Sequence, residues 1–376
     1  MGLDFLRFFF LQGGAFLTRK ILTTLGPKFH PPKIPRLFWS NLLKKATART
    51  WGKISSCKNL DATANAKDHM EIIHSPSEIA QKASCVTIGN FDGLHLGHQS
   101  LIRRVKEISA KEHYQSIVIT FWPHPRQVVT PDKPHFAITT RERRLELLAA
   151  YNLDTILELP FTKELANHTP EEFVLEYLKP LETKYLITGY DFSLGRGRSA
   201  HTKELVTLGQ KWGFVVEQMP PLMHDGTIVS STHLRSLISQ GALDQAEQLL
   251  GRPYQLLGIV RPGAARGRTL GFPTANILPP NTLLPATGVY AAYATIGQTT
   301  SRALVNIGHN PTFGDNPLSI ESYLLDLSGD FYDCRLTLSF VARLRPEQKF
   351  NSPEDLVNQI KLDLANANKI FAEKKN

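Results

Sequence analysis

The stretch Val86-Thr-Ile-Gly-Asn-Phe-Asp-Gly-Leu-His-Leu-Gly-His98 organises the first half of this chain. The apolar run Cys85–Ile88 predicts a short buried strand, and the glycine-rich residues after it predict a turn. Apolar residues then recur at helical spacing from 101 to 108, so a helix is expected to follow. His95 and His98 therefore lie where a strand passes into a helix, a place where free backbone N–H groups and the helix dipole favour an anion.

Strand-like and helix-like segments alternate beyond this stretch, which predicts a doubly wound parallel sheet. Ligands of such sheets bind at the C-terminal ends of the strands. The expected strands are Ser116–Phe121, Asp154–Leu159, Tyr185–Thr188 and Phe214–Glu217, and the expected helices are Arg141–Tyr151, Pro170–Leu178 and His201–Trp212.

Three polar clusters follow later strands or open a later helix. Thr120–Pro125 contains His124, and two prolines there predict an extended turn, although a loop with core aromatics is the alternative. Gly189–Arg198 contains Asp191 and two arginines, which suit phosphate or flavin contacts unless the loop is only a solvated basic turn. Val229–Arg235 contains Ser230, Ser231 and Thr232, whose hydroxyls can cap a helix and, together with Arg235, can bind an anion.

Gly89–His98 resembles the nucleotide-binding signature of the nucleotidylyltransferase superfamily, in the form found in bacterial-type bifunctional riboflavin kinase/FMN adenylyltransferases (FAD synthetases). The resemblance implies a Rossmann-like domain in which His95 and His98 donate to the phosphates of ATP and Arg235 steadies the triphosphate. Trp122 and Leu194 depart from the family pattern, which usually has an acidic or small residue and an aromatic residue at those positions. The residues implied to bind ATP or flavin are Gly89, Asn90, Phe91, Gly97, His124, Asp191, Ser230, Ser231 and Thr232.

The pattern changes after Gly251, where short β-runs follow one another without helices between them. This order predicts an antiparallel β-barrel. A terminal helix is expected from Ser352-Pro353, a cap followed by proline at the first helical position. The predicted domains are therefore 70–250 and 251–376. The expected strands are Tyr254–Val260, Gly288–Ala294, Ala303–Asn306, Ile320–Leu325 and Arg335–Val341.

The chemical centre of this second half is the segment 263–276, a Gly/Arg loop before an extended Pro-Thr-Ala-Asn. It lacks the Gly-Lys-Ser/Thr ending of a Walker loop. In an extended segment Thr274 and Asn276 project to the same side, and their neutral oxygens suit Mg²⁺ that must keep its charge for bound phosphates. As isolated residues both are more often turn formers.

The same segment resembles the riboflavin kinase signature, as do the stretches that begin at Asn306 and at Glu321. The resemblance implies that Glu321 is the general base, while an edge-strand carboxylate without a catalytic role is the alternative. Asp333 replaces a usual glycine of the family. The residues implied to bind ATP or flavin are Gly263, Arg266, Gly267, Arg268, Gly271, Pro273 and Asn306.

Positive charge is concentrated at one end of the chain. The formal net charge is +9, but residues 1–60 contain eleven Lys or Arg and a single acidic residue, so the remainder is nearly neutral. The body therefore lacks the basic surface of a nucleic-acid binder, and no apolar run is long enough for a transmembrane helix. We expect small-molecule partners, no nucleic acid and no membrane; self-association stays open.

Residues 1–69 are expected to form a basic, poorly ordered extension. Their composition is compatible with an organellar transit peptide, with a disordered tail, or with upstream DNA read as protein. Met70 begins a segment that would serve as the start of a bacterial enzyme. A cytoplasmic location is expected, and an organelle is the alternative if the extension is a transit peptide.

The hypothesis is a bifunctional enzyme that uses ATP and Mg²⁺ to phosphorylate riboflavin to FMN, and then ATP to convert FMN to FAD and pyrophosphate. One alternative is an enzyme with a single live activity, for which Trp122 would weaken the first site. Another is a flavin- or nucleotide-binding regulator, which has no need of Glu321. A tRNA-linked synthetase is disfavoured by the nearly neutral body.

Overall fold

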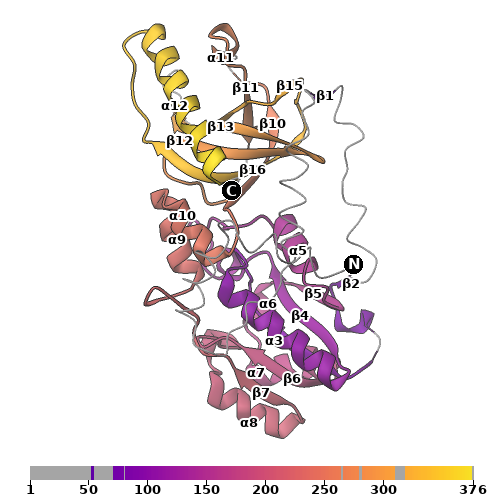
Figure 1. Ribbon diagram of the computed structural model, residues 1–376. Coiled ribbons are helices and arrows are strands. Elements are labelled where there is room, and N and C mark those ends of the chain that lie inside the picture. Colours follow the sequence, from indigo (N-terminus) through magenta and orange to yellow (C-terminus); the bar gives the residue numbers. More distant parts are fainter. Residues whose placement is uncertain are drawn as a thin grey trace, which may run out of the picture.

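The computed structural model describes residues 52–54, 71–79, 81–263, 266–278, 282–309 and 318–374, with the backbone alone for 52–54, Arg266 and Thr269. It contains a parallel sheet covered by helices and a closed barrel (Figure 1). The expectations for residues 1–69 other than 52–54, and for 310–313, lie outside the described residues.

Six parallel strands form the sheet, in the order β2-β5-β4-β3-β6-β7. Every strand expected between 85 and 217 is present, and β2 is an addition that the sequence did not predict. The central strand β3 is buried along its whole length because helices cover both of its faces. The strands are β2 (Glu71–Ile73), β3 (Ser84–Ile88), β4 (Gln115–Trp122), β5 (Thr155–Pro160), β6 (Thr183–Thr188) and β7 (Val215–Gln218).

Helices pack on both faces of the sheet, as a doubly wound fold requires. Val86 and Ile88 share one apolar cluster with Phe173 and Leu205, whereas Cys85 shares another with Ile102. Neighbouring residues of a strand point to opposite faces, so this division follows from the strand itself. The helices are α3 (Leu96–Glu112), α4 (Pro125–Val129), α5 (Arg141–Ala149), α6 (Lys163–Ala166), α7 (Pro170–Phe173), the π-helical η2 (Val174–Leu178) and α8 (Thr202–Trp212), with short 3-10 turns η1 (Pro76–Glu78) and η3 (Arg196–Arg198).

The second half forms a closed antiparallel barrel, as predicted, with the strand order β10-β11-β14-β13-β12-β16. Ser352 caps the terminal helix α12 (Pro353–Glu373) by accepting from the Asp355 N–H at 3.1 Å. The strands are β10 (Gln255–Arg261), β11 (Thr274–Leu278), β12 (Gly288–Ile296), β13 (Thr299–His309), β14 (Leu318–Leu324) and β16 (Arg335–Arg345); β15 (Leu327–Gly329) pairs with β1 (Gly52–Ile54), and α11 (Arg266–Thr269) precedes β11.

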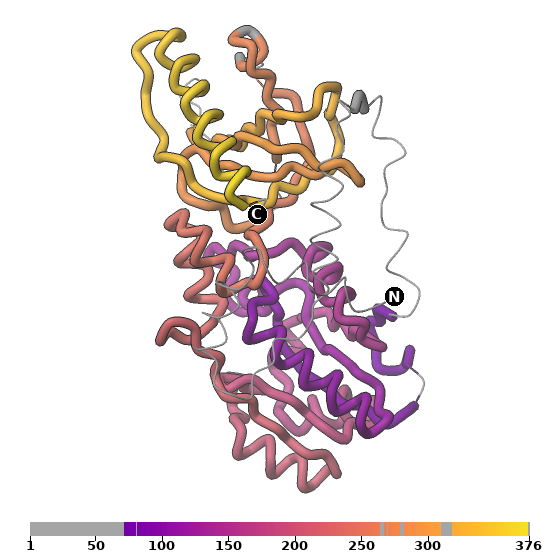
Figure 2. The backbone as a smooth tube through the Cα atoms, in the orientation of Figure 1, coloured from indigo at the N-terminus to yellow at the C-terminus, as the bar shows by residue number. Residues whose placement is uncertain are grey.

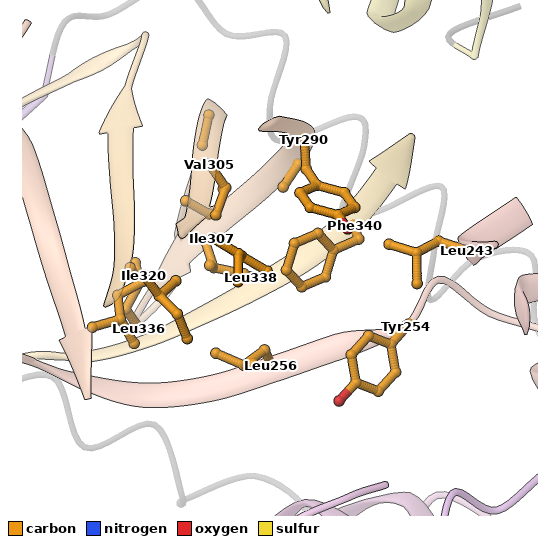
Figure 3. Close-up of a cluster of buried hydrophobic side chains, with 14 of the residues drawn as sticks. Leu243, Tyr254, Leu256, Tyr290, Val305, Ile307, Ile320, Leu336, Leu338 and Phe340 are labelled. Carbon is orange, nitrogen blue, oxygen red and sulfur yellow. The ribbon is translucent and has the colours of Figure 1, made fainter. Parts of the chain in front are cut away.

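The helices α9 (Ser231–Gln240) and α10 (Leu243–Leu250) lie at the junction between sheet and barrel, after the two-residue strands β8 (Met223–His224) and β9 (Thr227–Ile228) (Figures 1 and 2). Leu243 of α10 belongs to the same apolar cluster as the barrel residues Tyr254 and Phe340 (Figure 3). Lys374, at the C-terminal end of α12, also donates to Glu247 of α10 at 2.9 Å. The interior of the barrel is therefore continuous with the helix pair that closes the first half.

Candidate active sites

The turn after β3 has an unusual backbone that positions the first site. Phe91, Gly93 and Leu94 have φ values of 50°, 80° and 40°, so three of four successive residues lie in the left-handed region. Gly93 suits this conformation and also lies in a tight place, since an added Cβ would be 3.0 Å from Ile138. The Phe91 ring is fully buried against Gly89, so its role in this structure is to pack the turn.

His95 and His98 lie at the start of α3 with their rings stacked, the centroids 3.7 Å apart and the planes 16° apart. His95 is the N-cap of the helix, and its Nδ1 accepts from the His98 N–H at 3.3 Å. Nδ1 of His95 is therefore the acceptor and Nε2 carries the proton in the neutral ring. Nδ1 of His98 is buried without a hydrogen-bond partner among the described residues. Gly97 between them leaves room for the His95 ring, which a Cβ would approach to 3.2 Å.

Both histidines are neutral at physiological pH. Burial lowers the pKa of His95 to about 4, and the positive charge of Arg252 is the next cause. Burial lowers the pKa of His98 well below its ordinary value, and the neighbouring His95 adds to the effect. A neutral imidazole can still donate one hydrogen bond to a phosphate oxygen, so the pair is suited to positioning an anion rather than to neutralising it.

The helix α9 faces this turn, as the sequence predicted for Ser230–Arg235. Arg235 donates to Oδ2 of Asp92 at 2.5 Å, and the Ser231 hydroxyl donates to the carbonyl oxygen of Asp92 at 3.1 Å. Ser230 caps α9 by accepting from the His233 N–H at 3.2 Å, so its hydroxyl has the capping role that the sequence allowed. Thr232 is exposed, and among the described residues its hydroxyl makes no hydrogen bond to the turn. Asp92 connects the two elements, although it was not among the predicted site residues.

A second pair of histidines, His124 and His135, lies near Arg235, which also influences the first pair. The rings of His124 and His135 are stacked with centroids 4.0 Å apart, and both side chains are buried. Burial, followed by the charge of His135, lowers the pKa of His124 to about 3, and Arg235 contributes as well. His124 therefore lies near Arg235, as expected, whereas His135 was missed because no local pattern marks it. His124 also caps α4, which begins at Pro125, so the expected extended turn is only two residues long.

The remaining predicted residues of this half divide into two groups. The carbonyl oxygen of Asn90 accepts from Arg144 at 3.1 Å, which ties the turn to the buried Arg144–Glu158 pair. Asp191 lies exposed in the loop after β6, where Arg198 donates to its carbonyl oxygen at 3.0 Å. In the described part of the chain, no hydrogen bond or ion pair joins Asp191 to His95 or His98.

The structure shows where the three residues that depart from the family pattern lie, two of them in this half. Trp122 is 41% exposed at the end of β4, and its ring centroid lies 6.0 Å from the guanidinium carbon of Arg144. Leu194 is buried in the cluster that covers one face of the sheet. In the barrel half, Asp333 adopts a φ of 61° where glycine is usual, and it pairs with Arg261.

The second site lies on the outer face of the barrel, where neighbouring strands align its polar side chains in one row. Glu321 of β14 is directly opposite Asn276 of β11 on one side and Asn306 of β13 on the other. Such pairs place Cβ atoms about 4.5–5.5 Å apart. Thr274 lies on the same face as Asn276, and its hydroxyl approaches Oε2 of Glu321 at 3.4 Å. The strand β11 thus confirms the prediction that Thr274 and Asn276 project to one side.

The loop before β11 approaches this row closely because it contains glycine. A Cβ on Gly263 would lie 2.0 Å from Nδ2 of Asn276, and one on Gly267 would lie 2.3 Å from the carbonyl oxygen of Phe272. Gly271 has a φ of 85°. The other predicted residues of the loop, Arg268 and Pro273, are exposed, and the Arg266 side chain lies outside the described part of the chain.

One further carboxylate lies beside this row. Oε1 of Glu347 would be 2.4 Å from a Cβ on Gly308, and Nδ2 of Asn306 would be 3.4 Å from it, so the Glu347 side chain lies against the end of β13. The sequence gave no signal for it beyond its charge, because the contact crosses from the loop after β16 to another strand.

The chemistry of the two sites defines a class of protein. Neutral imidazoles and an arginine at the carboxyl ends of parallel strands are suited to binding a nucleoside triphosphate. A carboxylate beside a hydroxyl and amide oxygens suits proton removal near a phosphoryl group. The chain is thus a nucleotide-dependent transferase with two separate centres.

Comparisons with known proteins give the family. A family model described as FAD synthetase matches residues 77–233, and one described as riboflavin kinase matches residues 250–371. The chain is 35% identical to a bifunctional riboflavin kinase/FMN adenylyltransferase of Listeria monocytogenes, over 77% of this chain and 92% of that protein. It is 38% identical to the protein of the same name from Pseudomonas fluorescens, over 77% of this chain and 93% of that protein. It is 33% identical to the one from Escherichia coli, over 80% of this chain and 96% of that protein. The chain belongs to the bifunctional riboflavin kinase/FMN adenylyltransferase family and is an enzyme of FMN and FAD synthesis.

The fold has a counterpart among solved structures. A crystal structure titled as a macrolide-efflux protein from Streptococcus pneumoniae superposes with a TM-score of 0.72 at 30% identity, covering 79% of this chain and 97% of that chain. Among the helices that the structure describes here, none combines the length and the apolar character needed to span a membrane.

Proposed function

We propose that the barrel half, 251–376, phosphorylates riboflavin and that the sheet half, 70–250, transfers AMP from ATP to the resulting FMN. The observation that carries this assignment is the row Asn276–Glu321–Asn306 with Thr274 beside it, because it joins three separate strands into one polar site. The stacked histidines facing Arg235 support the second activity in the same way.

In the kinase half, Glu321 acts as general base and takes the proton from the ribityl hydroxyl that attacks the γ-phosphorus of ATP, with ADP leaving. Thr274 and Asn276 supply hard, neutral oxygens on one face of β11, which fits Mg²⁺. When bound there, the ion offsets the negative charge of the phosphates. Asn306, on the other side of Glu321, offers an amide to orient the flavin chain or the phosphates. A positioned base contributes roughly 10²- to 10⁴-fold to the rate.

In the adenylyl half, an oxygen of the FMN phosphate attacks the α-phosphorus of ATP and pyrophosphate leaves. The proton on Nε2 of the neutral His95 and one ring nitrogen of His98 donate to phosphate oxygens as charge builds. Arg235, whose direction is set by Asp92, stabilises the triphosphate. Because no covalent intermediate forms, positioning and charge stabilisation supply the catalysis.

The test is a chromatographic time course of riboflavin with ATP and Mg²⁺. Wild type is expected to form FMN and then FAD. Glu321→Gln is expected to leave riboflavin unconverted but to convert supplied FMN to FAD. The double variant His95→Ala/His98→Ala is expected to stop at FMN. Each variant thus serves as the folding control for the other site.

Two outcomes would favour the alternatives. Accumulation of FMN alone by wild type would mean that the sheet half has another acceptor or is inactive. Binding of flavin without any product would indicate a regulator. A Glu321→Gln protein that phosphorylates riboflavin at the wild-type rate would remove that residue from its assigned role.

The other assignments follow the substrates. The proposed partners are riboflavin, FMN and ATP, without nucleic acid, because the chain beyond residue 60 is nearly neutral. The proposed location is the cytoplasm, in keeping with the bacterial relatives. Import of a fluorescent fusion of residues 1–69 into an organelle would overturn that location, and sedimentation at micromolar concentration would show any self-association.

A further inference from the structure

Arg252, just after the last helix of the sheet half, is buried against the turn that positions the histidines. Its side chain is only 9% exposed. Nη2 donates to the carbonyl oxygen of Gly93 at 2.6 Å, and Nη1 donates to those of Leu94 at 3.1 Å and Leu250 at 3.3 Å. One guanidinium therefore joins the two residues before His95 to the segment that connects the halves.

Gln99 reinforces the same connection from the first turns of α3. Its amide donates to the carbonyl oxygens of Leu94 at 3.0 Å and Leu250 at 2.8 Å. Leu94 thus has a carbonyl that accepts from two buried side chains. Leu94 is a non-glycine residue with a φ of 40°, a conformation that costs free energy unless its surroundings hold it, and the bonds to its carbonyl oxygen do so.

The charge of Arg252 has no counter-ion among the ion pairs of the described residues. Burial, followed by the charge of Arg143, lowers the pKa of Arg252 to about 9. Its charge also depresses the pKa of His95 and of His98.

We propose that Arg252 is a positioning residue for adenylyl transfer: from the start of the kinase half it fixes the backbone of Gly93 and Leu94, and hence the direction of His95, and makes that reaction depend on the connection between the halves. The inference rests on the proposed function of the sheet half. It assigns no contact between Arg252 and substrate.

The test compares kcat and KM for both reactions in full-length Arg252→Gln, Arg252→Lys and wild type. Arg252→Gln keeps one hydrogen-bond donor but loses the positive charge and the second donating nitrogen. The kcat for FMN adenylylation should then fall on the order of 10²-fold, which is the effect of moving a catalytic side chain by about 1 Å. KM for FMN and ATP should change less than threefold. Arg252→Lys retains the charge and one donor, and its kcat should recover to within about tenfold of wild type. Riboflavin phosphorylation by the same proteins should stay within twofold.

Arg335→Gln is the matched control. It removes another contact between the halves, the pair of Arg335 with Glu146 at 3.0 Å, without touching the turn, and both activities should stay within twofold. The proposal is overturned if Arg252→Gln adenylylates FMN with a kcat within twofold of wild type, if it loses both activities in proportion, or if Arg335→Gln has the same selective effect. If Arg252→Gln does not fold, the Arg252→Lys variant provides the test. A fall in its kcat for adenylylation alone supports the proposal, and an unchanged kcat overturns it. A wild type that forms no FAD would instead refute the proposed function.

Discussion

The buried histidines predict how the stability of this protein depends on pH. His95 and His124 have pKa values of about 4 and about 3 in the folded protein, compared with 6.5 when exposed. Between these values the unfolded chain binds more protons than the folded one, so the free energy of unfolding must fall as the pH falls from above 6.5 toward 4. At higher pH both states carry neutral rings and this contribution does not change.

The size of the effect follows from the two pKa values of each residue. On going from pH 7.5 to pH 5.0, linkage gives a loss of about 2 kcal/mol for each of the two histidines, and hence about 4 kcal/mol together. That is a large part of the 5–15 kcal/mol typical of a folded domain. Nucleotide must be absent, because its phosphates would favour the protonated rings.

The assay is urea unfolding at both pH values for wild type and for His95→Gln/His124→Gln. Glutamine does not titrate, so the double variant should lose about 4 kcal/mol less than wild type over this interval, while the other ionisable groups contribute equally to both. The control is His113→Asn, which removes an exposed histidine at the end of α3 and should lose as much as wild type. An equal loss in wild type and the double variant would refute the view that these rings are buried and neutral.

Three further predictions concern single positions. Gly267→Ala places a Cβ 2.3 Å from the Phe272 carbonyl oxygen, so riboflavin phosphorylation should fall at least tenfold while supplied FMN is still converted to FAD; equal phosphorylation would contradict the close approach. Asp363→Ala leaves the partly buried Arg345 without the buried carboxylate that it contacts at 2.9 Å, which should lower the free energy of unfolding by about 1.5–3 kcal/mol in urea titrations; a change below about 0.5 kcal/mol would contradict it. His113→Gly relieves a φ of 58° at the end of α3 and should raise stability by about 0.5–1 kcal/mol, whereas a loss would show that the side chain contributes.

Most of the fold could be predicted because its elements have strong local patterns. The run from Cys85 to Ile88 is apolar on both faces, and β3 is buried throughout. The edge strand β2 could not be found, because only Ile73 of its three residues is buried. One helix was expected over 170–178, but the chain changes to π-helical geometry at Val174, which an apolar period does not distinguish from an α-helix.

The candidate sites were predictable only where a short motif contains the chemistry. His95, His98 and Thr274 with Asn276 are such cases, because a turn or a strand places neighbours in sequence together. Asp92 lies inside the motif Val86–His98. An acidic residue in that motif, together with the predicted anion-binding Arg235, was a signal that could have identified the pair. The positions of His135, Arg252 and Glu347 depend on contacts between distant segments, for which one sequence contains no local pattern.

The continuity between the barrel interior and the pair α9–α10 has a consequence for how the protein is made. Leu243, Leu249 and Leu250 bury their side chains in a cluster that the later barrel completes. A ribosome that has released residues 1–250 has therefore exposed every residue of the proposed adenylyl site except its support from Arg252, and has also exposed an apolar helix face without its partner. We therefore expect the turn before His95 to gain its support from Arg252, and the helix pair its apolar partner, only as the second half emerges from the ribosome.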